Sequence, residues 1–146
     1  TVFRQTMFAE FELAVHEAVG KGEVMTADRL CEIYGELNKK YFGPEVVYDD
    51  QIAMEWARIP HFYNAFYVYK YATGYSAAVA LSRRILTGGQ AARDAYMEFL
   101  AAGDSDYPIE LLKGAGVDMS TPEVVDSAMK TFRELIGQLE ELVEND

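Results

Sequence analysis

Residues 58–80 read RIPHFYNAFYVYKYATGYSAAVA, and this aromatic stretch decides the fold that the sequence predicts. It holds His61, one of the two histidines of the chain, together with a dense run of tyrosines and phenylalanines. Pro60 cannot lie inside a helix and disfavours the helical conformation of the residue before it. We therefore expect one element to end near Ala57 and an aromatic helix to follow over about 62–86, with His61 at its mouth.

The aromatic residues of the predicted helix fall on two of its sides. One side carries tyrosines four residues apart, namely Tyr63, Tyr67, Tyr71 and Tyr75. The opposite side carries Phe62, Phe66, Tyr69 and Thr73. A helix that is aromatic all round is normally buried at the centre of a bundle, but one side could instead line a substrate cleft. The periodicity leaves both readings open.

Glycine and proline residues divide the rest of the chain into further helical segments. In no segment do apolar and polar residues alternate as they do in a strand. The segments expected to be helical are 2–21, a helix capped by Thr26 and stopped by Gly43-Pro44, 51–57, 90–102, 108–112 and 120–143. The predicted class is all-α, a compact multi-helix bundle organised around the aromatic helix at about 62–86. A length of 146 residues fits a single helical unit over 1–146.

The composition restricts the partners and the compartment. A net charge of −11 argues against nucleic acid or an anionic membrane as a partner, because both need a basic surface. The single cysteine, Cys31, cannot form an intrachain disulfide, and we expect it to pack in a helix. The sequence shows no signal peptide and no run of apolar residues that could span a membrane, so a cytoplasmic protein is the default expectation.

A metal site of the His-Glu-x-x-His type is not complete in this sequence. Two histidines at i and i+4 share a helix face and can hold zinc beside the glutamate. His16-Glu17 begins that pattern, but its fifth position is Gly20. A glycine-rich phosphate loop and a serine nucleophile elbow are also absent. The remaining candidates are His61 and the phenols that follow it, groups that can bind a peptide and donate hydrogen bonds to an oxyanion.

Three phrases carry a resemblance to a known family. They are FRQTMFAEFE near the start, RIPHFYNAFYVYKYATGYSAA in the middle and YPIELLKGAGVDM toward the end. In this order and spacing they resemble the C-terminal part of the catalytic domain of oligoendopeptidase F, a zinc metallopeptidase of the thimet-oligopeptidase-like family. The resemblance covers essentially the whole chain.

The resemblance implies a mostly helical hydrolase, a metalloendopeptidase that cuts short peptides with one zinc ion. The zinc ligands would lie upstream, so this chain contributes none of them and should be inactive by itself. His61 matches a histidine that contacts the substrate backbone, and Tyr69 matches a tyrosine that donates its phenol to the tetrahedral oxyanion. Tyr63 and Tyr67 fall in the same signature and are candidates for binding the substrate.

On a helical wheel, Tyr67 and Tyr69 lie on opposite sides of the predicted helix. If Tyr69 faces the cleft, Tyr67 should point into the core, and Tyr69 and His61 should share an exposed concave surface. Surface that faced a missing N-terminal part should also be exposed, with Phe3, Met7 or Phe11 as further candidates, and could form a homodimer. Two other classes stay open: a helical module that binds peptides without cutting them, and a purely structural domain. Peptide length and side-chain specificity are not encoded in this stretch.

Overall fold

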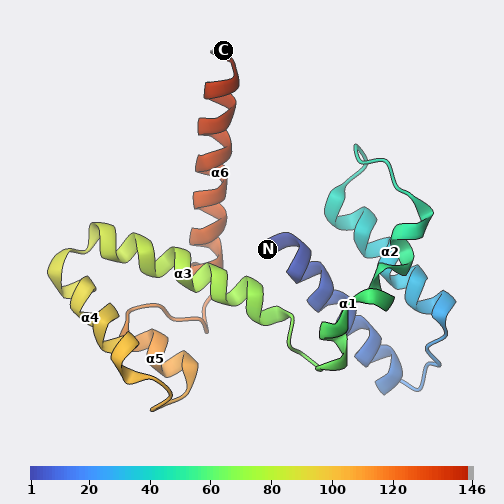
Figure 1. Cartoon of the computed structure of the whole chain (residues 1–146), viewed down its shortest axis with the longest axis horizontal. Coiled ribbons are helices and arrows are strands. Elements are labelled where there is room, and N and C mark those ends of the chain that lie inside the picture. Colours follow the sequence, from blue (N-terminus) through green and yellow to red (C-terminus); the bar gives the residue numbers. More distant parts are fainter. Residues whose placement is uncertain (145–146) are drawn as a thin grey trace. The chain divides into compact units, whose positions relative to one another are not determined.

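The computed structural model describes residues 1–144, in which helices are joined by loops and no strand is present (Figure 1). The α-helices are α1 (Val2–Gly20), α2 (Ala27–Phe42), α3 (Tyr69–Thr87), α4 (Gly89–Ala102), α5 (Pro108–Gly114) and α6 (Glu123–Glu144). Two 3₁₀ helices, η1 (Asp50–Arg58) and η2 (Pro60–Tyr63), lie between α2 and α3. The predicted all-α class is confirmed.

The chain divides into two units, residues 1–72 and residues 73–146, and each is described here by itself. The single helical unit expected over 1–146 stays a prediction. Within the described residues, no helix combines the length and the apolar character that crossing a lipid bilayer requires.

The core of the first unit lies between α1 and α2. Apolar side chains of both helices are buried there, together with the residues that flank η2: Met7, Phe8, Phe11, Ile33, Tyr34, Leu37, Ile59 and Val68. The rings of Phe11 and Tyr34 meet edge to face with centroids 5.2 Å apart, a favourable arrangement for aromatic pairs. The expectation that Met7 or Phe11 is exposed is therefore wrong, because both side chains fill this core. Phe3, one turn earlier, is exposed.

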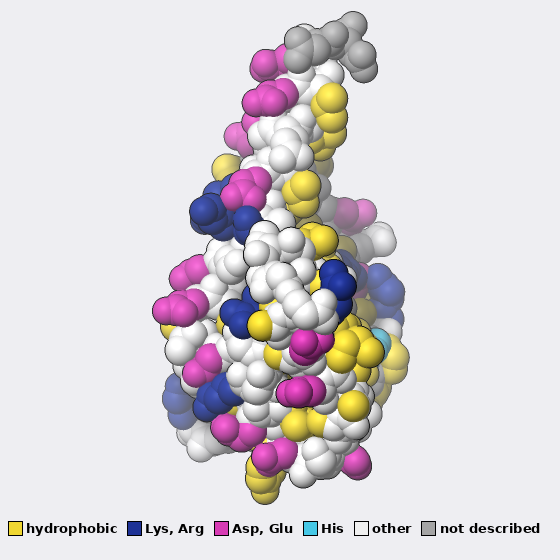
Figure 2. Space-filling view, turned by 90° about the vertical axis from the view of Figure 1, so that its left-hand side faces the viewer, with side chains coloured by type: hydrophobic (Ala, Val, Ile, Leu, Met, Phe, Trp, Pro, Cys, Tyr) yellow, Lys and Arg dark blue, Asp and Glu magenta, His cyan; other side chains and the backbone are white. Residues whose placement is uncertain are grey.

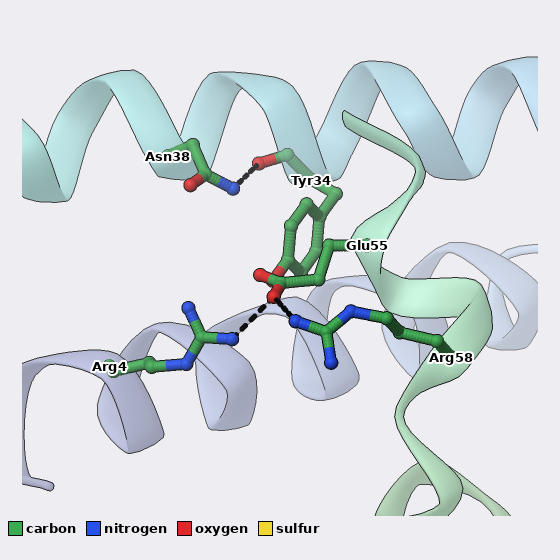
Figure 3. Close-up of polar contacts among 5 residues, drawn as sticks. All are labelled: Arg4, Tyr34, Asn38, Glu55 and Arg58. Atoms are coloured by element: carbon green, nitrogen blue, oxygen red, sulfur yellow. Dashed lines mark hydrogen bonds and ion pairs between the residues drawn. The ribbon is translucent and has the colours of Figure 1, made fainter. Parts of the chain in front are cut away.

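A buried carboxylate joins α1, α2 and η1 (Figure 3). Glu55 of η1 accepts a hydrogen bond from the Tyr34 hydroxyl at 2.7 Å and pairs with the guanidinium groups of Arg4 and Arg58. Burial acts to raise the pKa of Glu55, but the hydrogen bonds from Arg4 and Tyr34 outweigh it and hold this pKa below its ordinary value. These contacts offset the cost of burying the carboxylate, and they fix η1 against α1 and α2.

The aromatic helix begins later than the sequence predicts. Pro60 opens the short 3₁₀ helix η2, residues 64–68 form a turn, and α3 starts only at Tyr69. Phe66 interrupts any helix here because its backbone has a φ of 59°. The prediction of one helix over 62–86 is therefore wrong for residues 62–68, and the helical wheel does not describe them.

The second unit packs α3 from residue 73 onward against α4, α5, the loop after α5 and the first turns of α6. Its core consists of Ala77, Leu81, Ala115, Val117 and Val124, with Tyr96 and Phe99 at its edge. Beyond that core, α6 leaves an apolar stripe exposed at helical spacing: Phe132, Leu135, Ile136, Leu139, Leu142 and Val143. Figure 2 shows apolar side chains along one edge of this part of α6 and acidic ones along the opposite edge.

Candidate functional site

His61 follows a proline in the chain, and its ring is hydrogen-bonded to a tyrosine of α3. It lies in η2, two residues after the buried Ile59 and directly after Pro60, and its own side chain is half-buried. Its Nε2 atom lies 3.2 Å from the hydroxyl of Tyr71, a hydrogen bond whose direction is set by the histidine tautomer. The imidazole therefore has a defined orientation.

Three aromatic rings gather at this point. The Tyr67 ring stacks on His61 with centroids 5.6 Å apart and an interplanar angle of 22°. Tyr71 meets His61 and Tyr67 edge to face, at 5.9 and 5.6 Å. The neighbouring Tyr67 phenol, and to a smaller extent burial, raises the pKa of Tyr71, so this hydroxyl keeps its proton at neutral pH. We call His61, Tyr67 and Tyr71 the aromatic cluster.

Lys70 adds a positive charge next to the cluster. Its ammonium nitrogen lies 5.3 Å from the centre of the Tyr67 ring, within the range of a cation–π contact. The cluster thus presents an imidazole, two phenols and a cation within a few residues of one another. Such a set can hold the polar backbone of a bound peptide and stabilise negative charge on it.

The predicted site residues Tyr63, Tyr67 and Tyr69 are all exposed. Tyr69 is the first residue of α3 and is 49% exposed, and Tyr63 at the end of η2 is 88% exposed. Tyr67 is 37% exposed, so the expectation that it points into the core is wrong. The reason is the turn over residues 64–68, which replaces the helix on which that expectation was built. The shared concave surface of Tyr69 and His61 stays a prediction.

Two residues of this region were not predicted as site residues from the sequence. Tyr71 contacts His61 across the turn over residues 64–68, which helical spacing does not describe. Glu12 lies on α1, and its Oε1 atom accepts a hydrogen bond from the backbone amide of Phe66 at 2.6 Å. No local pattern could have revealed that second contact, because the two residues are 54 positions apart.

His16 packs against the same turn from α1. Its Nδ1 atom lies 2.8 Å from the backbone oxygen of Glu12, and its ring lies 4.7 Å from that of Phe66. Glu12, His16 and Phe62 help to line a cavity of about 170 Å³. Among the residues that the structure describes, no three histidine, cysteine, aspartate or glutamate side chains are grouped closely enough to hold a metal ion.

Known proteins resemble this chain over nearly its full length. It is 56% identical over 143 residues to Oligopeptidase PepF of Bacillus subtilis (strain 168), covering 98% of this chain and 21% of that protein. It is 48% identical over 144 residues to "Oligoendopeptidase F, plasmid" of Lactococcus lactis subsp. cremoris, covering 99% of this chain and 24% of that protein. The chain therefore spans between a fifth and a quarter of the length of these relatives.

A solved structure shows the same fold. The crystal structure of oligoendopeptidase-F from Enterococcus faecium superimposes with a TM-score of 0.96 and 48% sequence identity, covering 100% of this chain and 28% of that one. The model of peptidase family M3 matches residues 1–131, which include α1, the aromatic cluster and the first turns of α6. The chain belongs to peptidase family M3.

Proposed function

We propose that this chain is the C-terminal portion of a zinc-dependent oligoendopeptidase that hydrolyses short peptides in the cytoplasm. The observation that carries the proposal is the aromatic cluster, in which His61 forms a hydrogen bond with Tyr71 and stacks with Tyr67. Membership of a peptidase family and the peptidase names of the relatives support it. The net charge of −11 favours peptides over nucleic acid as partners.

Within residues 1–144, no three histidine, cysteine, aspartate or glutamate side chains lie close enough together to form a zinc site. We therefore assign the metal to residues outside this chain and derive no step through it. The contribution of residues 1–146 is to bind and orient the peptide and to stabilise the charge that develops on it.

The roles that we propose for the site residues are those that the family resemblance implies. The imidazole of His61 would hydrogen-bond the peptide backbone near the bond that is cut, and Tyr71 keeps that ring in place. The phenol of Tyr69 would donate a hydrogen bond to the oxyanion of the tetrahedral intermediate, where such donors act most strongly. Tyr67, which stacks on His61, and the exposed Tyr63 would contact the peptide.

The test is the substitution Tyr69→Phe in the full-length enzyme, with hydrolysis of a quenched fluorescent peptide as the readout. Loss of one oxyanion donor should lower kcat by roughly 10² to 10³-fold and leave KM nearly unchanged. Tyr75→Phe is the matched control, because Tyr75 lies on the same helix and is 53% exposed. An unchanged kcat in Tyr69→Phe at equal zinc content would remove Tyr69 from the mechanism.

A further inference from the structure

Phe66 has a backbone conformation that an L-residue rarely adopts. In the part of the chain that the structure describes, it is the one non-glycine residue with a positive φ, at 59°. A bulky side chain in this region is strained and keeps its conformation only where the surroundings hold it. The turn over residues 64–68 therefore needs an external restraint.

That restraint comes from α1. The Glu12 side chain is only 4% exposed, and its Oε1 atom accepts the hydrogen bond from the Phe66 amide at 2.6 Å. One helical turn later, the His16 ring packs at 4.7 Å from the Phe66 ring. Both the backbone and the side chain of Phe66 are thus fixed by neighbouring residues of one helix. Burying a carboxylate costs free energy unless the group is hydrogen-bonded, and the Phe66 amide provides such a hydrogen bond to Glu12.

The turn that Glu12 holds separates the two halves of the candidate site. His61 lies in η2 before the turn, whereas Tyr67 lies within it and Tyr69 immediately after it. Val68 is buried, so the turn is fixed in the core at that end. A change in the backbone at Phe66 would shift Tyr67 and Tyr69 relative to His61, because Phe66 lies between these tyrosines and the histidine in the chain.

We propose that Glu12 is a positioning residue of the peptidase reaction, whose carboxylate holds the Phe66 turn and thereby sets Tyr67 and Tyr69 against His61. This proposal rests on the proposed function. Glu12 acts through the backbone and touches no reacting atom. Misplacement of catalytic groups by about 1 Å can cost on the order of 10²-fold in rate, so a distant residue of this kind can matter.

The experiment compares Glu12→Ala, Glu12→Gln and Glu10→Ala in the full-length enzyme. Glu10 is the matched control, because it lies two residues earlier on α1 and its carboxylate binds Lys40 and Tyr41 of α2 instead. Two quantities are measured: kcat and KM for a fluorescent peptide, and amide hydrogen exchange by mass spectrometry in a proteolytic fragment that covers residues 62–68. The exchange measurement needs no catalytic activity.

Glu12→Ala should raise hydrogen exchange in residues 62–68 and lower kcat by roughly 10- to 100-fold, with a smaller change in KM. Glu12→Gln keeps an amide oxygen that can accept the Phe66 hydrogen bond, so both quantities should lie between those of Glu12→Ala and wild type. Glu10→Ala should leave kcat within about 2-fold of wild type and leave exchange in residues 62–68 unchanged.

Several results would overturn the proposal. Unchanged exchange in residues 62–68 of Glu12→Ala would show that the carboxylate does not hold the turn. Raised exchange with wild-type kcat would show that the turn does not position the site, and a kcat loss in Glu10→Ala as large as in Glu12→Ala would indicate general destabilisation. If the wild-type protein cleaves no peptide, the proposed function fails, and with it the positioning role, whereas the exchange result still decides whether Glu12 holds the turn.

Discussion

At the scale of single residues, the polar contacts of the first unit converge on Glu55. Its carboxylate is buried, accepts a hydrogen bond from Tyr34 and forms ion pairs with Arg4 and Arg58. The side chains of Arg4 and Arg58 are 42% and 70% exposed, so water would hydrate both cations if Glu55 were removed. The buried Tyr34 hydroxyl, in contrast, would lose its acceptor, and a buried donor without a partner is destabilising.

Glu55→Ala should lower the free energy of unfolding by about 2 kcal/mol, as measured by chemical denaturation, because the buried Tyr34 hydroxyl loses its acceptor. The pKa of Glu55 in the folded chain is lower than its ordinary value of 4.5, so its stabilising contribution is present above about pH 4.5 and is lost as the pH falls further. Wild type should consequently lose more stability between about pH 7 and pH 3 than Glu55→Gln, which has no carboxyl to titrate. Glu110→Gln, which removes an exposed pair with Lys113, is the control, and an equal acid dependence of wild type and Glu55→Gln would contradict the prediction.

At the scale of the elements, helix ends follow local chemistry. Thr26 was predicted as the N-cap of the second helix, and its hydroxyl oxygen accepts a hydrogen bond from the backbone amide of Arg29 at 3.2 Å. Gly103 ends α4 with a φ of 57°, a conformation that favours glycine. Such signals depend on a few neighbouring residues, which is why the sequence alone predicts them well.

Thr26→Ala should destabilise the chain by about 1 kcal/mol, because the amide at the start of α2 loses its acceptor. Thr6→Ala is a matched control, since the Thr6 hydroxyl only donates to the Val2 carbonyl within α1 and lies at the surface. Thermal or urea denaturation of both variants measures the difference. Equal stability of Thr26→Ala and Thr6→Ala would show that the cap contributes nothing.

The errors of the sequence-based prediction have a common physical origin. The break at Pro60 and the all-α class were correct. The placement of His61 at the mouth of the aromatic helix was wrong, because His61 lies inside η2 and α3 begins only at Tyr69. The helix over 62–68 was wrong, because a carboxylate on α1 holds Phe66 in the left-handed region. Met7 and Phe11 were assigned to an exposed surface because sequence periodicity shows that a helix has an apolar face, but not which element covers it.

At the scale of the whole molecule, residues 1–146 carry one part of the proposed active site. The chain spans 21% of the Bacillus subtilis relative, and its described residues offer no group of three metal ligands. The apolar stripe of α6 is exposed, and so are the side chains of Phe3 and Tyr69. At this scale we therefore propose that residues 1–146 form a single helical unit and that an N-terminal part of the same protein completes the site. We also propose that the chain self-associates through its exposed apolar surface.

The isolated 146-residue chain should cleave no peptide, even with added zinc, because it lacks the proposed metal ligands. It should self-associate at micromolar concentration, since exposed apolar patches favour contact between copies. Peptide hydrolysis on a fluorescent substrate and sedimentation velocity measure the two properties, with the full-length enzyme as the control for the assay. Cleavage that persists through repeated purification would refute the first expectation, and a monomer at every concentration would refute the second.

Arg4 and Glu55 are 51 positions apart, so their ion pair closes most of the first unit into one loop. Helices such as α1 and α2 can form within microseconds, whereas contacts between distant positions must first overcome the entropy of loop closure. The carboxylate cannot leave water until Arg4 and Tyr34 have both reached it, because an uncompensated buried charge is strongly unfavourable. We therefore expect burial of Glu55 to coincide with docking of α1 against α2 and to follow the formation of the helices, which would make this docking slower than helix formation.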